Sequence, residues 1–435
     1  MTEESGGAVI AKDATHTHRM TALAPEIPRS LFRHKPFAFY WSARVLSAIS
    51  FQLQGVAVGW QIYALTHSAL ALGLVGLVQF LPMLALTLVV GHVADRYDRR
   101  RIIAACQLTG GLATGFLMLG SIAGWLTPGL IFAAVAVIGA MRVFEMPSGQ
   151  ALLPGLVPIA VFPRAAALSA SALQTAFIIG PAAGGFLYAL GPAVPYGLAA
   201  LLWLAACLSS TLIRMERPPV SRAPVTLASV FSGFAFIRRQ PAILGSISLD
   251  LFAVLLGGAT ALLPVFARDI LHTGPWGLGL LRSGPALGAL GMSILLAHRP
   301  LRQRVGRTMF RAVIVFGLAT ILFALSRWLW LSVAAMVVLG AADVISVVIR
   351  SSLVQIATPD EMRGRVSAVN GLFIGTSNQL GEFESGVTAA LFGAVPAVIL
   401  GGIGTILVAL FWMRLFPSLR EADTLEGFKP ASEKS

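Results

Sequence analysis

The stretch GHVADRYDRRR, residues 91–101, directly follows LVQFLPMLALTLVV, residues 77–90. The first carries two acids, four arginines and a histidine, whereas the second has no charged side chain. So abrupt a change predicts that the chain leaves an apolar environment and enters water near Gly91. A helix that crosses a bilayer needs about 20 mostly apolar residues, so the length of the apolar runs decides whether that environment is lipid.

The composition of the whole chain points to lipid. Of its 435 residues 56% are apolar and only 12% are charged, and the mean hydropathy is +0.80. A globular domain has about 25% charged residues, so most of this surface must face something other than water. The net charge of +13 is scattered in short clusters and forms no continuous basic face, which excludes nucleic acid as the expected partner. Cys106 and Cys207 lie inside apolar runs and predict neither a disulfide nor a metal site.

Apolar runs of spanning length occur twelve times along the chain. They predict an all-α membrane protein with twelve transmembrane helices. The predicted helices lie at about 37–64, 70–90, 102–124, 128–150, 164–190, 193–213, 242–267, 276–297, 309–326, 329–351, 365–390 and 395–416.

One connection is long, and it divides the spans into two sets of six. Residues 214–241 are rich in proline and arginine, and we expect them to form a cytoplasmic linker between an N-terminal six-helix bundle, 37–213, and a C-terminal one, 242–416. Residues 1–36 and 417–435 are polar and are expected to be disordered cytoplasmic tails. The first tail lacks the apolar core of a signal peptide.

Arginines predict the orientation. They are concentrated in alternate loops, whereas the intervening loops contain only Arg268 and Arg327. Because basic loops stay in the cytoplasm, we expect both termini to be cytoplasmic in a multi-pass protein of the inner, or plasma, membrane.

An internal repeat relates the two halves. VIGAMRVFEMPSGQALLPGLVP (137–158) aligns without gaps with VLGAADVISVVIRSSLVQIATP (338–359), at an offset of 201 residues. LALGLV (70–75) aligns with WGLGLL (276–281) at an offset of 206. Two parallel six-span repeats predict pseudo-symmetric bundles with a substrate path between them at the midplane.

The charged stretch resembles the Gly-x-x-x-Asp-Arg-x-x-Arg-Arg signature of the major facilitator superfamily. With TPDEMRGRVSAV (358–369) and LTHSALALGLV (65–75) it is similar to the branch that contains enterobactin exporters and drug:proton antiporters, over about residues 36–416. The resemblance implies a transporter that works by alternating access. It also implies a cytoplasmic latch in which this stretch caps span eleven, which begins near Gly364. Asp98 stands where many members have glycine. The matching residues are Gly91, Asp95, Arg96, Arg99 and Arg100.

The residue types support a latch on physical grounds. Gly91 permits close approach of two helices, Asp95 precedes Arg99 by four residues, the favourable order for a helical pair, and a carboxylate can cap a helix N-terminus. A plain positive patch that only sets topology is the alternative.

Charged residues inside the spans are costly and mark a path or a pair. Arg44 maps onto Asp250 at the 206 offset, and Arg142 maps onto Asp343 at the 201 offset. We expect each base to face its acid across a central cavity. The alternative for Arg142 is a static pair with Glu145 on its own helix. The polar stripe of Arg44 also includes Gln54 and Gln61, Arg350 is expected to snorkel to the surface, and Arg282 has no counterpart.

Span five contains GPAAGG (180–185), which resembles the core of the superfamily's antiporter motif and therefore implies efflux. The proline kinks a helix and the glycines permit close packing, although the two upstream glycines of the motif are Ala167 and Ala176 here. The matching residues are Gly180, Pro181, Gly184 and Gly185.

The counterpart in span eleven, GEFESG (381–386), carries two carboxylates that are candidates for proton coupling. Glu382 shares a helix face with Asn378 and Ser385, so we expect Glu382 to reach a polar cavity and Glu384 to have the weaker role. Pairing of both with basic loops is the alternative.

The sequence shows no nucleotide-binding loop and no cluster with metal-ligand spacing, so we expect no cofactor and no enzyme activity. It predicts a secondary transporter, a monomer in the lipid bilayer, that exports a small amphipathic or aromatic compound of the drug or siderophore class with protons as the coupling ion. Uptake of a small solute is the main alternative, and a membrane-embedded enzyme or a channel is less favoured.

Overall fold

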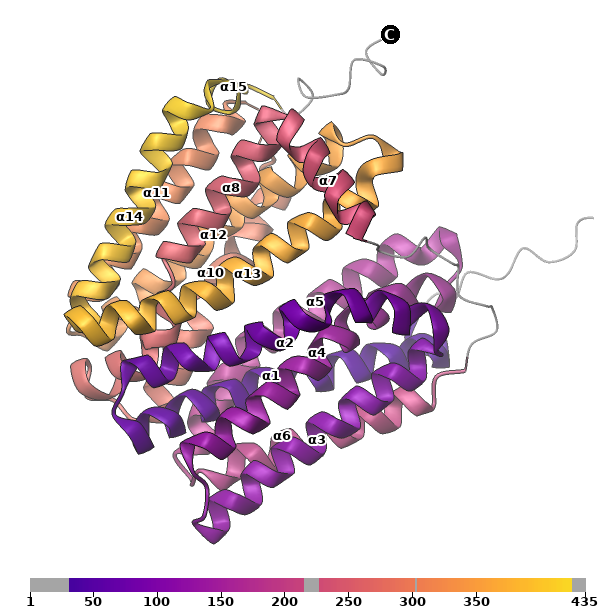
Figure 1. Ribbon diagram of the computed structural model, residues 1–435, viewed down its shortest axis with the longest axis vertical. Helices are drawn as coiled ribbons and strands as arrows, with labels where there is room; N and C mark the ends of the chain where they lie inside the picture. Colours follow the sequence, from indigo (N-terminus) through magenta and orange to yellow (C-terminus); the bar gives the residue numbers. More distant parts are fainter. Residues whose placement is uncertain (1–30, 215–226, 302, 425–435) are drawn as a thin grey trace, which may run out of the picture.

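The computed structural model describes residues 31–214, 227–301 and 303–424. These residues are almost entirely helical and contain no strand. The helices form two bundles, the first indigo to magenta and the second pink to yellow in Figure 1. The predicted all-α fold of two six-helix bundles is confirmed.

The first bundle follows a short 3₁₀ turn at Leu31–Arg33. Its six helices are α1 (Lys35–Thr66), α2 (Ala69–Arg96), α3 (Arg99–Ala123), α4 (Pro128–Leu156), α5 (Phe162–Tyr188) and α6 (Ala193–Thr211).

The second bundle is preceded by α7 (Leu227–Arg239). Its helices are α8 (Pro241–Leu256), α9 (Leu263–Val265), α10 (Pro275–His298), α11 (Val305–Leu325), α12 (Leu329–Ala357), α13 (Asp360–Phe392), α14 (Ala394–Leu415) and the short α15 (Pro417–Arg420).

Eleven segments are long and apolar enough to cross a membrane. The twelfth predicted span is α13, which is too polar for that test because it carries Asn378, Glu382 and Glu384. It nevertheless lies alongside α2 of the first bundle and α8 of the second, so its polar side chains are placed at the seam between the bundles.

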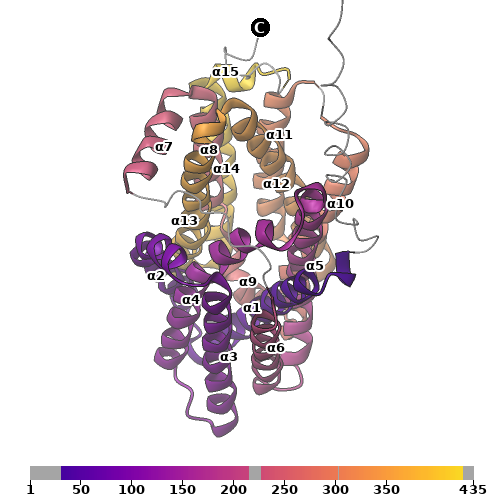
Figure 2. The ribbon, with the colours of Figure 1, turned by 90° about the vertical axis from the view of Figure 1, so that its right-hand side faces the viewer.

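We call the end of the molecule that holds Tyr97 and Asp98 the hinge end, and the opposite end, which holds His67 and Ser68, the far end. The two bundles approach each other at the far end and diverge toward the hinge end, where α7 lies (Figure 1). Figure 2 shows the second bundle above the first, with the linker segment α7 at the side of the second.

The seventh span differs from the continuous helix that the sequence predicts. Helix α8 stops at Leu256, and after Gly257 and Gly258 the chain continues as a 3₁₀ turn (Ala259–Leu262), α9 and a π-helical turn (Phe266–Ile270). Consecutive glycines weaken a helix, and Pro264 removes a backbone donor that a continuous helix would need. The carbonyl of Ala253 at the break is satisfied by Gly257 N at 2.9 Å and by the Thr405 hydroxyl at 3.0 Å.

The predicted tails are shorter in the structure. Leu31 is buried against the first bundle, and beyond Phe416 the helix α15 packs on the second bundle through the buried Leu419. The backbone nitrogens of Val305 and Gly306 donate to carbonyls of Asp423 and Ala422. The remaining parts of the tails and of the linker, residues 1–30, 215–226 and 425–435, lie outside the described residues.

Candidate functional site: a cavity between the bundles

A cavity of about 580 Å³ lies at the seam between the bundles. Helices α1, α2, α4 and α5 of the first bundle and α8, α10, α11, α12 and α13 of the second contribute to its wall. Its volume suits a drug-sized ligand. The break in the seventh span lies on this wall through Gly257 and Gly258, consistent with the rule that irregular backbone at membrane depth is tolerated where it lines a cavity.

Six carboxamides and three aromatic rings stand among the aliphatic residues of the lining. Such a surface offers hydrogen-bond donors and acceptors beside flat apolar faces, which suits a polar aromatic ligand. The amides are Gln52, Gln54, Gln79, Gln174, Asn378 and Gln379, and the rings are Phe51, Phe177 and Phe316.

Not every amide is free to bind a ligand. The Gln54 oxygen accepts from the Thr114 hydroxyl at 2.6 Å and from the Trp203 indole at 3.3 Å, so Gln54 is held by its own bundle. Gln379, by contrast, has a buried side-chain oxygen without a hydrogen-bond partner in the described structure. Gln61 is outside the lining and donates to Ser121 at 3.2 Å.

Three charged side chains line the cavity, all from the second bundle: Arg282, Asp343 and Glu382. Arg282 and Glu382 are near enough to attract each other electrostatically. The side chain of Asp343 has no hydrogen bond or ion pair within the part of the chain that the structure describes. The carboxylate of Asp343 is therefore without a partner. It is available to bind a proton or to accept a hydrogen bond from a ligand.

Arg282 and Glu382 both press against glycines of the first bundle. Arg282 Nη1 donates to the carbonyl of Gly55 on α1 at 3.2 Å. A Cβ atom placed on Gly76 of α2 would lie 2.9 Å from a carboxylate oxygen of Glu382. Two of the three charges of the cavity are thus also contacts across the seam, so their surroundings must change if the bundles move apart.

Glycines set the closest approaches of the two bundles. A Cβ atom on Gly386 of α13 would lie 2.5 Å from Cα of Gly73 on α2, and one on Gly185 of α5 would lie 2.9 Å from Cα of Gly279 on α10. Toward the hinge end the two bundles diverge (Figure 1). The structure is therefore closed at the far end.

Hydrogen bonds reinforce this closure between α5 and α10. Gln174 Nε2 donates to the carbonyl of Ala286 at 2.9 Å, and the Ser283 hydroxyl donates to the carbonyl of Ile178 at 2.8 Å. The antiporter-like residues lie on the same helix: Gly180 and Gly184 pack on α1, Gly185 packs on α10, and Pro181 lies within α5.

Three charged residues of the stretch 91–101 have partners within the first bundle. Asp98 caps α3, since its carboxylate accepts from the backbone nitrogen of Arg100 at 2.9 Å and pairs with the Arg100 guanidinium at 2.6 Å. Arg100 also donates to the carbonyl of Ile213 at 3.0 Å, and Arg99 is buried and donates to the carbonyl of Ala151 at 3.2 Å. Asp98, the departure from the superfamily signature, thus has a structural role that sequence reasoning missed.

Arg96 is exposed at the end of α2, and Gly91 and Asp95 lie on the same helix. The surroundings of Gly91 and the side chain of Asp95 lie outside the described structure, so the latch on span eleven stays a prediction.

The expected pairing of Arg44 with Asp250 across the cavity is wrong in this structure. Asp250 forms an ion pair with Arg350 of α12, and both side chains are buried in the second bundle. Arg350 therefore does not snorkel to the surface. A buried charge needs an opposite charge at close range. The neighbouring helix α12 supplies this charge to Asp250, and the opposite bundle does not.

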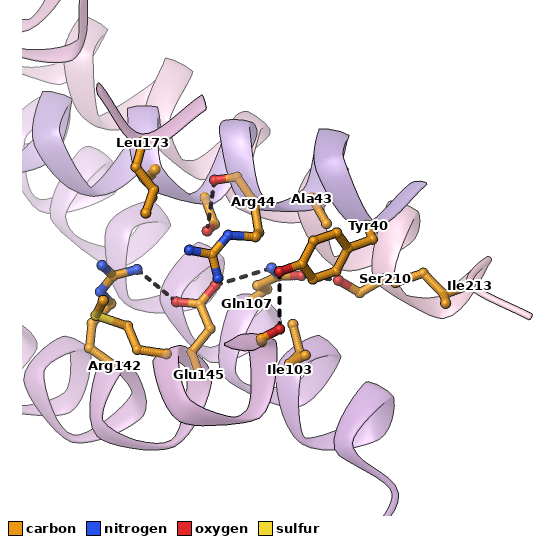
Figure 3. A pocket seen from close by; sticks show the side chains of 14 residues that line it. Tyr40, Ala43, Arg44, Ile103, Gln107, Arg142, Glu145, Leu173, Ser210 and Ile213 are labelled. Carbon is orange, nitrogen blue, oxygen red and sulfur yellow. Dashed lines mark hydrogen bonds and ion pairs between the residues drawn. The ribbon is translucent and has the colours of Figure 1, made fainter. Parts of the chain in front are cut away.

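Arg142 likewise does not face Asp343. It pairs with Glu145, three residues along α4, at 2.9 Å, which is the alternative weighed from the sequence. Figure 3 shows Arg142, Glu145 and Arg44 together in a separate pocket inside the first bundle.

Of the two carboxylates on span eleven, Glu382 lines the cavity and Glu384 does not. Glu384 accepts a hydrogen bond from the Thr388 hydroxyl at 2.8 Å. Arg282, which the sequence left unassigned, is the cation of the described cavity lining. The Gly-Gly and Pro signals at 257–264 could have located this wall, since interrupted spans mark binding sites in transporters.

Two pseudo-symmetric six-helix bundles around a cavity at their seam define a secondary transporter of the major facilitator fold. The model of a family described as transmembrane secretion effector, within the major facilitator superfamily, matches residues 23–432, and the chain belongs to this family. Because this family consists of transporters, the alternative that the chain is a membrane-embedded enzyme is not supported.

Two relatives are exporters, in agreement with this family. The chain is 31% identical to the enterobactin exporter EntS of Citrobacter koseri, covering 89% of this chain and 93% of that one, and 29% identical to EntS of Shigella boydii, with the same coverage.

The fold is similar to that of a bacterial homolog of the human lysosomal transporter Spinster in an inward-facing, unoccupied conformation (14% identity, TM-score 0.71, 90% of this chain and 99% of that one). It is also similar to that of the nucleoside transporter NupG (16%, TM-score 0.63, 87% and 99%).

Proposed function

We propose that the chain is a proton-driven exporter that carries a small amphipathic or aromatic compound of the siderophore class out of the cell by alternating access. The observation that carries the proposal is the 580 Å³ cavity at the seam, lined by amides, rings and a carboxylate without a partner. A cavity walled by both bundles opens to either side when the bundles rock about it.

Two observations favour export over uptake. The relatives that share 29–31% of their residues with this chain are named as enterobactin exporters. Gly185 of the antiporter-like motif on α5 also lies where the first bundle meets α10, so it shapes the closure at the far end.

The arginine-rich loops support a cytoplasmic hinge end. Arg96, Arg99 and Arg100 lie there, and so does the end of α7 with Arg238 and Arg239. With this orientation the described state is closed toward the outside, and the cavity is prepared to receive a compound from the cytoplasm.

Asp343 and Glu382 are the proposed coupling groups. Each is a carboxylate on the cavity wall, and a group that exchanges protons must meet water in at least one state. Glu382 also touches Gly76 across the seam, so its surroundings change with closure at the far end. Transport against a gradient requires such a link between protonation and conformation.

Uptake into inside-out membrane vesicles tests the proposal. Metal-free enterobactin is the probe, and respiration makes the vesicle lumen acidic. We expect the probe to accumulate in the lumen, and a protonophore should abolish the accumulation. Vesicles with the Asp343→Asn, Glu382→Gln double variant serve as the control. Accumulation only in right-side-out vesicles would contradict export, and a protonophore-insensitive signal would contradict proton coupling.

A further inference from the structure

A second pocket, of about 30 Å³, lies inside the first bundle. It is bounded by α1, α3, α4, α5 and α6, and it shares no lining residue with the central cavity. The transport cycle proposed above does not use it. Its polar lining residues are Tyr40, Arg44, Ser47, Gln107, Arg142, Glu145 and Ser210.

The single carboxylate of this pocket already has two partners. Glu145 is 5% exposed and accepts from Arg142 Nη1 at 2.9 Å with one oxygen and from Gln107 Nε2 at 3.1 Å with the other. The Gln107 oxygen in turn accepts from the Ser210 hydroxyl at 2.7 Å. Glu145 therefore neutralises Arg142, and the pocket lining has no second carboxylate to neutralise a second cation.

Arg44 is that second cation, and its charge is unmatched. It forms no ion pair within the described structure, and its Nε atom is buried without a hydrogen-bond partner. Figure 3 shows its guanidinium group directed into the pocket from α1, toward Glu145. The nearby Tyr40 hydroxyl is already used, since it donates to the carbonyl of Gly149 at 3.1 Å.

The pocket therefore holds two permanent positive charges and one negative charge. Arginine stays protonated in proteins. Arg44 is half-buried, and a charge withdrawn from water in this way is stabilised by a counter-charge or hydrogen-bond partners. A volume of about 30 Å³ accepts one or two water-sized species, which excludes an organic anion. We propose that this pocket binds one small monovalent anion, chloride, between Arg44 and the Arg142–Glu145 pair.

The side chain of Phe51 connects the anion site to the wall of the central cavity. The guanidinium of Arg142 stacks over the Phe51 ring at 4.5 Å, and Phe51 lines the cavity. A chloride that fixes Arg142 would also fix this wall of the cavity, so its occupancy should affect the first bundle as a unit.

Thermal unfolding of the purified full-length protein tests the proposal. Sodium chloride and sodium gluconate are compared at equal ionic strength. We expect chloride, but not gluconate, to raise the Tm in a saturable way by about 2–4 °C. Arg44→Gln should lose this rise, and Arg311→Gln, which removes an exposed arginine of α11, should keep it. A wild-type Tm equal in both salts, or an equal rise in Arg44→Gln, would overturn the site.

Crystals of the wild-type protein grown in bromide give an answer that does not depend on a variant. The expected result is one anomalous peak in the pocket beside Arg44. Water alone in the pocket at saturating bromide would overturn the proposal. Both measurements are independent of transport, so a failure here is distinct from a failure of the proposed export function.

Discussion

Tyr63 of the first bundle donates a hydrogen bond to the carboxylate of Asp269 in the second. Tyr63 is buried at the end of α1, and Asp269 lies in the π-helical turn that ends the seventh span. The guanidinium of Arg268 lies 6.0 Å from the centre of the same ring. This contact closes the far end, and it must break if the bundles open toward that side.

The first prediction concerns this contact. Tyr63→Phe removes a hydrogen bond to a charged group, which contributes about 1.5–3 kcal/mol, so the equilibrium should shift about tenfold or more toward the state open at the far end. Spin-label distances across the far end measure the shift. Tyr188→Phe, at the same end but without a described hydrogen bond, is the control. Unchanged distances in Tyr63→Phe would contradict a closing role.

The second prediction concerns the pair of Asp250 and Arg350. Removing one member leaves an unpaired buried charge, so Asp250→Asn or Arg350→Leu should each lower the unfolding free energy by about 3–5 kcal/mol. The double variant should lose less than the sum. Thermal unfolding of the wild type, the two single variants and the double variant measures the coupling energy between Asp250 and Arg350. The same cycle on Arg44 and Asp250 should be additive, and coupling there would revive the pairing across the cavity.

The third prediction separates the carboxylates of span eleven. Glu382→Gln keeps the shape and loses the titratable proton, so it should abolish proton-driven accumulation while downhill exchange continues. Glu384→Gln should have a weaker effect because Glu384 is outside the cavity lining. Vesicle flux with and without a pH gradient distinguishes the two activities. Uphill accumulation by Glu382→Gln would move the coupling role to Asp343.

The fourth prediction concerns Asp98. The hydrogen bond from the Arg100 side chain holds the pKa of this carboxyl below its ordinary value. A lowered folded-state pKa stabilises the protein above the unfolded pKa, near 3.9, and the contribution is lost as the pH falls through the folded value. Because the pair is about one-third exposed, the effect of the charge should be well under 1 kcal/mol.

Two variants separate charge from capping at Asp98. Asp98→Asn keeps an oxygen for the cap and should remove only the pH-dependent part of the stability. Asp98→Ala should cost about 1 kcal/mol more, because the start of α3 loses its cap. Unfolding curves at several pH values measure both, and equal losses in the two variants would contradict the capping role.

The spans were predictable because lipid imposes a length and a composition on each helix. Even α13, which fails a simple hydropathy test, was predicted, because its apolar residues extend over a spanning length at about 365–390. The break after Leu256 was missed because the segment is apolar enough overall to read as one span, and two glycines interrupt a helix with little change in its hydropathy.

The cavity was harder to predict than the fold. Repeat symmetry relates Arg44 to Asp250, but it does not show which arginine lies nearest to Asp250. The ion-pair partner of Asp250 is Arg350, on the adjacent helix α12. Helix faces did predict that Glu382 and not Glu384 would be directed to the cavity. Arg282 has no repeat partner, so symmetry could not place it, although its contact with Gly55 makes it part of the seam.

Alternating access requires that a compound crosses this protein only when the closed far end opens. Cysteines at positions 63 and 269, in a chain whose Cys106 and Cys207 are replaced by alanine, can be joined by a short thiol cross-linker that a reductant cleaves. The measurement is proton-driven accumulation of enterobactin in inside-out vesicles before cross-linking, after it, and after reduction. We expect cross-linking to stop accumulation and reduction to restore it. Accumulation that continues at the original rate with the far end fully cross-linked would contradict alternating access.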